Sequence, residues 1–389
     1  MPTRYTLVVL MFAFATTVTF AVDEPPKEWI AAGEKRRDEI PLGGDFKPQA
    51  KVAAFVAVGH GARIVVSKDD GKTWTQAFFG YPGSDHGGWA SSSVAYTGGV
   101  FAVPIGWTQP TSYLASDDGV RWRHLTDGKT PLAGKDHPNL MPTTGSLAGG
   151  KGTFVGSGYT TFTATPDFGK SWSVISVNAF KNDPRGKLST HHVKIIYCGD
   201  ASGRFLALGD NRGADGPKFG HLFATDDLGK TWKWLAPKGL DDLKGRGAIA
   251  SNGPLVLMTD PAAENVWCSA DAGETWDGPH PTGAKRGALS VVKNEFWLVG
   301  EPSRAAADAP RASADGKTWH NLPKTLPAGK FVASDNGTLI DIDPRRFSIL
   351  RSADAGATWE AVFTFTPETQ YVHGAQGLRD IAFGYVNAD

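Results

Sequence analysis

Four acidic side chains follow apolar runs at a recurring spacing, and each could take part in chemistry. They come directly after the segments FLALG, LVLMT, FWLVG and LIDI, at Asp210, Asp260, Glu301 and Asp343. Carboxylates accept hydrogen bonds from ligand hydroxyls, and two of them about 5–10 Å apart can hydrolyse a glycosidic bond. We therefore take Asp210, Asp260 and Glu301 as candidate catalytic residues and Asp343 as a candidate ligand-binding residue.

Basic residues precede the neighbouring apolar runs, at Arg246, Arg286, Lys330 and Arg379. If adjacent runs pair as antiparallel strands, each basic residue approaches the carboxylate that follows it, so that Lys330 approaches Asp343 and Arg246 approaches Asp260. Such pairs could be structural, because clusters of charge often serve the scaffold. Alternatively, the ring is a polar ligand site in which the carboxylates accept hydroxyls and Arg246, Arg286 and Arg379 bind an anion.

The same position in the remaining runs holds other candidate ligand-binding residues, namely His60, Tyr159 and, beside Gly106, Trp107. Aromatic rings stack on the apolar faces of sugars, while polar neighbours take the hydroxyls. A second register contains His86, His137 and His373. Three imidazoles on one arc could bind a metal, but no short motif such as HExxH accompanies them. We predict neither a metal nor a cofactor and regard these histidines as hydrogen-bonding candidates.

Seven copies of one motif indicate which elements position these residues. The pattern is Ser/Thr-x-Asp-(x)-Gly-x-x-Trp, and it occurs as SKDDGKTW (67–74), SDDGVRW (116–122), TPDFGKSW (165–172), TDDLGKTW (225–232), SADAGETW (269–276), SADGKTW (313–319) and SADAGATW (352–359). The hydroxyl and the carboxylate can bind the backbone of a tight turn, in which Gly takes positive φ. A period near 40–50 residues with strand-like runs between the motifs is typical of one four-stranded propeller blade per repeat.

The motif resembles the Asp-box, or bacterial neuraminidase repeat, of the sialidase-like superfamily. The resemblance implies an all-β, seven-bladed β-propeller with four-stranded blades and does not imply one activity, because the repeat occurs in sialidases, other glycosidases, assembly factors and sorting receptors. The first blade lacks a first strand before AFVAVG (54–59), and GLRDIAFG (377–384) is a first strand with no blade after it. We predict that this C-terminal strand completes blade one and closes the ring, which removes an exposed edge.

A sialidase of this superfamily needs three arginines, a tyrosine nucleophile and an acid. By that resemblance Arg246, Arg286 and Arg379 could form the triad and Tyr371 the nucleophile, although the usual Phe/Tyr-Arg-Ile-Pro motif is absent. We favour a propeller that binds a carbohydrate or protein ligand on the face opposite the Asp boxes. The alternative is a sialidase-like or other glycoside hydrolase at the axial pocket, so whether the protein is an enzyme stays open.

The N-terminus predicts export. Arg4, an apolar stretch at 7–20 and Thr19-Phe20-Ala21 are typical of a signal peptide over residues 1–21, followed by an N-terminal extension at 22–50 and the propeller at 51–389. We expect a secreted or periplasmic monomer without membrane insertion. The 40 basic and 40 acidic residues balance, which argues against nucleic-acid binding. The two cysteines, Cys198 and Cys268, lie too far apart in the predicted fold for a disulfide, so we expect free thiols.

Overall fold

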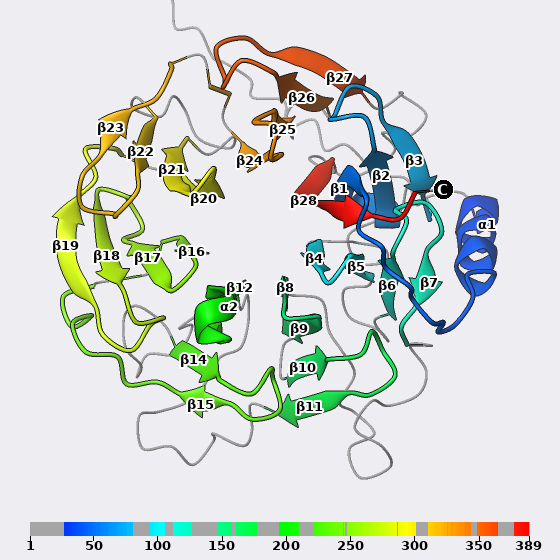
Figure 1. Ribbon diagram of the computed structural model, residues 1–389, viewed down its shortest axis with the longest axis horizontal. Coiled ribbons are helices and arrows are strands. Elements are labelled where there is room, and N and C mark those ends of the chain that lie inside the picture. The colour runs from blue at the N-terminus through cyan, green and yellow to red at the C-terminus, as the bar shows by residue number, and fades with distance from the viewer. Residues whose placement is uncertain are drawn as a thin grey trace, which may run out of the picture.

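The chain forms a ring of seven antiparallel sheets with four strands each around a central channel (Figure 1), which confirms the predicted seven-bladed β-propeller. The computed structural model describes residues 27–80, 93–105, 112–126, 146–157, 161–176, 194–209, 221–243, 245, 247–285, 287–300, 310–324, 326–327, 329–343, 348–364 and 377–388. Within these residues, no helix is long and apolar enough to cross a membrane.

Blades one to four follow the chain from its N-terminal side. Blade one contains β28 (Leu378–Val386), β1 (Val52–Gly59), β2 (Arg63–Ser67) and β3 (Thr75–Phe78). Blade two contains β4 (Ala95–Thr97), β5 (Val100–Ile105), β6 (Ser112–Ser116) and β7 (Arg123–His124). Blade three contains β8 (Ser146–Gly150), β9 (Thr153–Ser157), β10 (Thr161–Thr165) and β11 (Ser173–Ser176). Blade four contains β12 (Lys194–Tyr197), β13 (Phe205–Gly209), β14 (His221–Thr225) and β15 (Lys233–Trp234).

Blades five to seven complete the ring. Blade five contains β16 (Ile249–Asn252), β17 (Leu255–Thr259), β18 (Asn265–Ser269) and β19 (Asp277–Pro281). Blade six contains β20 (Ala288–Val292), β21 (Glu295–Val299), β22 (Arg311–Ser313) and β23 (His320–Asn321). Blade seven contains β24 (Lys330–Ala333), β25 (Leu339–Asp343), β26 (Ser348–Ser352) and β27 (Glu360–Thr364). The helical segments are α1 (Lys27–Asp38), η1 (His60–Ala62) and α2 (Gly199–Ser202).

The seven motif segments form tight turns between the third and fourth strands, called repeat turns below. In the turn at Asp271, Ser269 Oγ donates to the carboxylate and accepts from the Gly273 N–H, while the Thr275 N–H and hydroxyl donate to the carboxylate. Five turns carry an extra residue between Asp and Gly, which takes the left-handed conformation with φ of 55° to 61°. The motif therefore satisfies the polar groups of its own turn.

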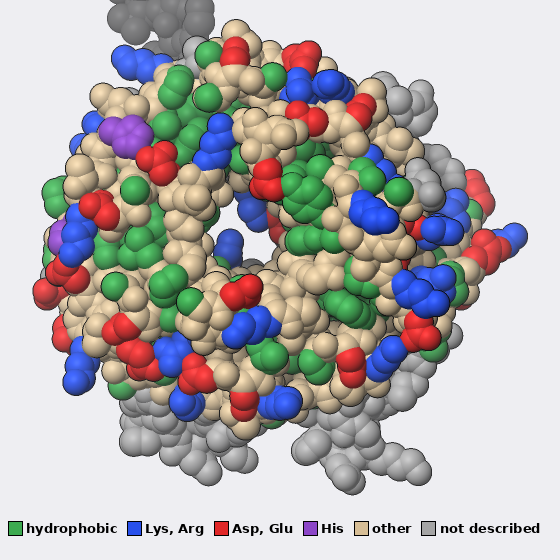
Figure 2. Space-filling model, in the orientation of Figure 1, with side chains coloured by type: hydrophobic (Ala, Val, Ile, Leu, Met, Phe, Trp, Pro, Cys, Tyr) green, Lys and Arg blue, Asp and Glu red, His purple; other side chains and the backbone are tan. Residues whose placement is uncertain are grey.

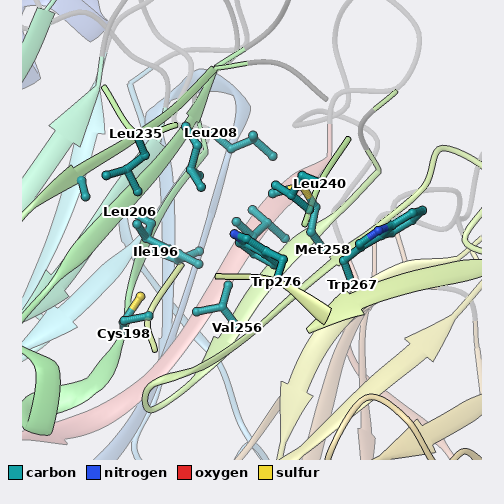
Figure 3. Packing of buried hydrophobic residues seen from close by; sticks show 14 of the residues in the cluster. Ile196, Cys198, Leu206, Leu208, Leu235, Leu240, Val256, Met258, Trp267 and Trp276 are labelled. Carbon is teal, nitrogen blue, oxygen red and sulfur yellow. The ribbon is translucent and has the colours of Figure 1, made fainter. Parts of the chain in front are cut away.

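The hydrophobic core lies between neighbouring blades. In blades four and five, Leu206 and Leu208 pack with Val256, Met258 and the repeat-turn residue Trp276 (Figure 3). Strand residues alternate between the two faces of each sheet, so every blade contributes to two such clusters. The free thiols of Cys198 and Cys268 are both buried, which confirms that these cysteines are unpaired.

The C-terminal strand closes the ring as predicted. β28 pairs with β1 from Val52↔Val386 to Gly59↔Leu378, inside the sheet that also holds β2 and β3. The N-terminal extension reinforces this junction, because Asn387 Nδ2 donates both to Lys47 O and to Asp117 Oδ2 at 3.1 Å. Helix α1 lies outside the ring beside β3 and β7 (Figure 1), where Arg36 Nε donates to Phe79 O at 3.0 Å.

Candidate functional site at the mouth of the central channel

Most of the predicted site residues lie outside the described part of the chain, and their roles stay predictions. They are Asp210, Glu301, Tyr371, Trp107, Tyr159, Arg246, Arg286, His86, His137 and His373. The structure describes Asp260, Asp343 and Arg379, and it describes the backbone of His60, which begins η1. No group of three metal-ligating side chains occurs within the described ranges.

The repeat turns fix how the second strands align from one blade to the next. In every blade the Ser/Thr of the repeat turn faces one residue of the second strand; these partners are Phe55, Phe101, Phe154, Phe205, Val256, Phe296 and Leu339. Counted from them, Asp260 and Asp343 come one residue earlier than Asp210 and Glu301. Asp260 and Asp343 therefore share one position, and a one-residue shift would point a side chain to the other face of the sheet. Asp210 and Glu301 lie outside the described residues, so a position shared by all four carboxylates stays a prediction.

The second strand of blade five is apolar on both faces, so its sequence does not mark which face is which. LVLMT offers no alternation between polar and apolar residues, whereas β25 carries Asp341 between Ile340 and Ile342. In the structure, Val256 packs against blade four and Leu257 against blade six. The repeat turns, whose Ser/Thr positions are unambiguous, give an alignment that does not depend on this pattern.

The described carboxylates at the strand ends have local partners. Asp260 accepts the Glu264 N–H at 3.0 Å on one oxygen and the Asn265 side-chain amide at 2.9 Å on the other. Asp343 is almost fully buried, with 9% of its surface exposed, whereas Arg379 is exposed. Asp260 is thus fixed by its own loop, and its position does not require an arginine.

At one position of the first strand, three of the blades hold a charged residue that was predicted to lie elsewhere or was not predicted. Lys194 faces Leu208, Lys330 faces Ile342 and Asp380 faces Val58. Each of these partners comes three residues after the residue that faces the repeat-turn Ser/Thr. The first strands form the inner edge of the ring, so the three side chains start from one level of the channel (Figure 1). Lys194 and Asp380 were not predicted, although counting from the repeat turns could have found them.

A cavity of about 580 Å³ opens at this level, on the side where the first strands begin and the second strands end. Its wall includes Lys194, Lys330 and Asp260, together with apolar residues such as Leu208 and Ile249. The repeat turns adjoin the opposite ends of the second strands, as Ser269↔Val256 shows. The cavity therefore lies on the face opposite the repeat turns. Basic side chains are visible inside the central opening (Figure 2).

Lys330 pairs with Asp380 of blade one, not with Asp343 as predicted, and this crosses a blade boundary. The Asp380 carboxylate is buried and also accepts the Val94 N–H and its neighbour Ile381 N–H, both at 2.9 Å. β24 lies next to β28 in the ring, so Lys330 reaches across the channel edge more easily than outward along its own sheet. Asp380 thus holds Lys330 at the cavity.

The positive charge of Lys330 lowers the pKa of Lys194 to about 8, with loss of bulk solvent as the second cause and Asp380 opposing both. Water still reaches the Lys194 side chain, because the channel is open. The arrangement can bind polar and anionic groups. Of the described residues that line the cavity, only Asp260 supplies a carboxylate, so this wall does not contain the carboxylate pair of a glycosidase.

No protein-family model and no curated protein matches the sequence. YCF48 from Cyanidioschyzon merolae is 16% identical with a TM-score of 0.49, over 76% of this chain and 90% of that one. A structure of YCF48 bound to D1 peptide is 15% identical with a TM-score of 0.38, over 90% and 98%. Streptogramin B lyase is 11% identical with a TM-score of 0.45, over 73% and 86%. Similarities at these identities and TM-scores carry no statement about what this chain binds or does.

Proposed function

We propose that the protein is an exported Asp-box propeller that binds a carbohydrate in the cavity at the channel mouth, on the face opposite the repeat turns. The cavity carries this proposal, because about 580 Å³ lies within the range of roughly 300–1,000 Å³ that small-ligand sites occupy. Its apolar wall suits the faces of sugar rings, and Asp260 and Ser290 offer partners for hydroxyls.

The signal-like segment at residues 1–21 supports export, and the seven repeat turns support the Asp-box assignment. Binding without hydrolysis is the simpler function for the described part of the cavity wall, since its carboxylate, Asp260, accepts hydrogen bonds on both oxygens. A general acid would need a second carboxylate across the ligand. The protein is therefore proposed as a binding protein.

A glycan array tests the proposal with matched Ala→Phe variants of one blade. Ala288 lines the cavity, so Ala288→Phe fills it, whereas Ala314 is exposed in the repeat turn of blade six. We expect the wild type and Ala314→Phe to bind the same glycans and Ala288→Phe to lose them at an unchanged melting temperature. No bound glycan, or full binding by Ala288→Phe, contradicts the proposal. A panel of fluorogenic glycosides on the same samples would reveal hydrolysis and contradict the binding role.

A further inference from the structure

Lys194 and Lys330 take one position of the first strand in blades four and seven. In the two blades between them, small residues take the equivalent position. Ala248 and Ala288 take the same position in blades five and six, since Ala288 faces Val299 and the Thr259 N–H donates to Ala248 O. Both alanines line the cavity together with the two lysines. The lysines of blades four and seven therefore flank a niche that the two blades between them leave open.

The two lysines at this niche differ in their ion-pair partners. Lys330 has the Asp380 carboxylate as its partner, and no carboxylate of the described residues lies within ion-pair distance of Lys194. The other carboxylate on the cavity wall, Asp260, already accepts two hydrogen bonds from its own loop. The groups that face Lys194 are thus Lys330 on β24, Asp380 on β28 and Asp260 after β17. The two carboxylates offset the formal charge of the two lysines, but neither forms an ion pair with Lys194.

Two ammonium groups that face one enclosed space repel each other, and this is why the pKa of Lys194 falls to about 8. An anion placed between them would remove the repulsion and gain charge-assisted hydrogen bonds from both. Lys330 keeps donors available for this role, because an ammonium group has three N–H bonds and the Asp380 contact uses one. Lys194 is exposed to solvent, so an anion can reach it.

We propose that Lys194 and Lys330 form an oxyanion-binding site and that the carbohydrate ligand carries a phosphate or carboxylate group, which the two ammonium groups hold between them. The carbohydrate part of this statement rests on the proposed function, whereas the oxyanion part does not. Lys194 and Lys330 are the ligand-contacting residues, and Asp380 is a positioning residue for Lys330.

Calorimetric titration of the purified protein at pH 7 tests the ligand class with glucose 6-phosphate, glucuronate and glucose. We expect one of the two acidic sugars to bind at least about tenfold more tightly than glucose, since hydrogen bonds to charged groups are strong. Lys194→Met should remove that preference. Lys293→Met, in the exposed hairpin between β20 and β21, should retain it. Equal affinity for all three sugars, or an unchanged preference in Lys194→Met, overturns the proposal.

Sulfate, whose charge is constant above pH 6, tests the role of Lys194 by pH. Because sulfate binds the protonated amine, its affinity should fall as the pH rises through about 8, the pKa of Lys194. The double variant Lys330→Met/Asp380→Asn removes the ion pair without leaving a lone buried carboxylate. It should bind sulfate more weakly, and the fall should move to higher pH, because Lys330 no longer lowers that pKa. A sulfate affinity that does not fall near pH 8 overturns the proposal. So does a fall that occurs at the same pH in the double variant as in the wild type.

These readouts separate the two proposals. Sulfate binding with the expected pH profile but no bound glycan supports the oxyanion site and contradicts the carbohydrate function. Glycans that bind in the cavity without any preference for an acidic group support the carbohydrate function and overturn the oxyanion site. A melting-temperature measurement on every variant confirms that the propeller is folded.

Discussion

At the scale of single residues, the carboxyl group of Asp341 has an unusual environment. It is fully buried, and neither of its oxygens has a hydrogen-bond partner among the described residues. A Cβ at Gly329 would come within 1.9 Å of Asp341 Oδ1, so the carboxyl packs directly against the glycine backbone. Burial, followed by the nearby Asp343, raises the pKa of Asp341 well above its ordinary value. The side chain is therefore protonated over a wider pH range than an exposed aspartate.

Asp341→Asn should make the stability of the folded protein less sensitive to rising pH. An unfolded aspartate loses its proton near pH ~3.9, whereas the folded chain keeps the Asp341 proton to higher pH. Between these two values the unfolded state binds fewer protons, so the wild type loses stability as the pH rises. The variant, which is neutral in both states, should melt higher than the wild type by an amount that grows from pH 4 to 7. A difference in melting temperature that does not change with pH would contradict this account. So would a difference that grows with pH in the exposed control Asp241→Asn.

The two thiols should be unreactive in the folded protein. Both are buried, and burial raises the pKa of Cys198 and of Cys268 to about 12, so neither forms a thiolate at neutral pH. Titration with a thiol reagent at pH 8 should detect almost none before unfolding and two per chain after it, without reductant. Fast reaction of the native protein would mean that the blade interfaces open, and no thiol after unfolding would mean a disulfide.

At the scale of elements, the repeat turns are acid-sensitive. Bonds from Thr358 and Ser352 lower the pKa of Asp354 to about 2, and the repeat-turn carboxylates at Asp227 and Asp271 also have lowered pKa values. A depressed folded pKa means that the stabilisation is complete above the unfolded value near pH ~4 and is lost as the pH falls through the folded value. We therefore expect the turns to stabilise the blades at neutral pH and to lose this stabilisation in acid.

Thr358→Val tests this in one turn. The variant keeps the Asp354 carboxylate but removes its first hydrogen-bond donor, the Thr358 hydroxyl at 2.6 Å. We expect the pKa of Asp354, followed by NMR of the side-chain carboxyl, to rise toward about 4. The acid-induced fall in melting temperature should begin at higher pH than in the wild type. The matched substitution Thr364→Val, at the end of β27 and outside the turn, should leave the pKa of Asp354 unchanged.

At the scale of the whole molecule, closure of the ring depends on β28. This strand supplies the fourth strand of blade one, paired with β1, and its Asp380 fixes Lys330 at the channel. Without it, β1 would present an unpaired edge, which favours aggregation. The segment before β1, residues 41–51, also contacts blade two, because the Leu42↔His124 bridge joins it to the outer strand of that blade.

Removal of residues 377–389 should therefore yield insoluble protein or a strongly lowered melting temperature. Removal of residues 388–389 alone keeps β28 and the Asn387 contacts, and it should yield soluble protein that melts close to the wild type. Solubility after expression and the thermal unfolding of any soluble fraction measure both outcomes. A soluble long truncation with an unchanged melting temperature would contradict closure by β28.

The sequence alone determined the fold. The repeat turns are local, since each Ser/Thr, Asp and Gly satisfies its own turn within a few residues. Their number gave the blade count, and the orphan strand at 377–384 gave the closure, because an unpaired edge in an otherwise complete repeat must be matched somewhere. Local hydrogen bonding and repetition are properties that a sequence displays directly.

Only the tertiary structure decided which side chains meet at the channel. Asp260 and Asp343 each come four residues after the residue that faces the repeat turn. A strand such as LVLMT, which is apolar on both faces, does not show this position by itself. Lys330 was assigned to Asp343 on its own blade, but the ring places it beside Asp380 from the far end of the chain. Contacts across blade boundaries depend on how seven sheets close into a circle, and no local pattern in the sequence encodes that geometry.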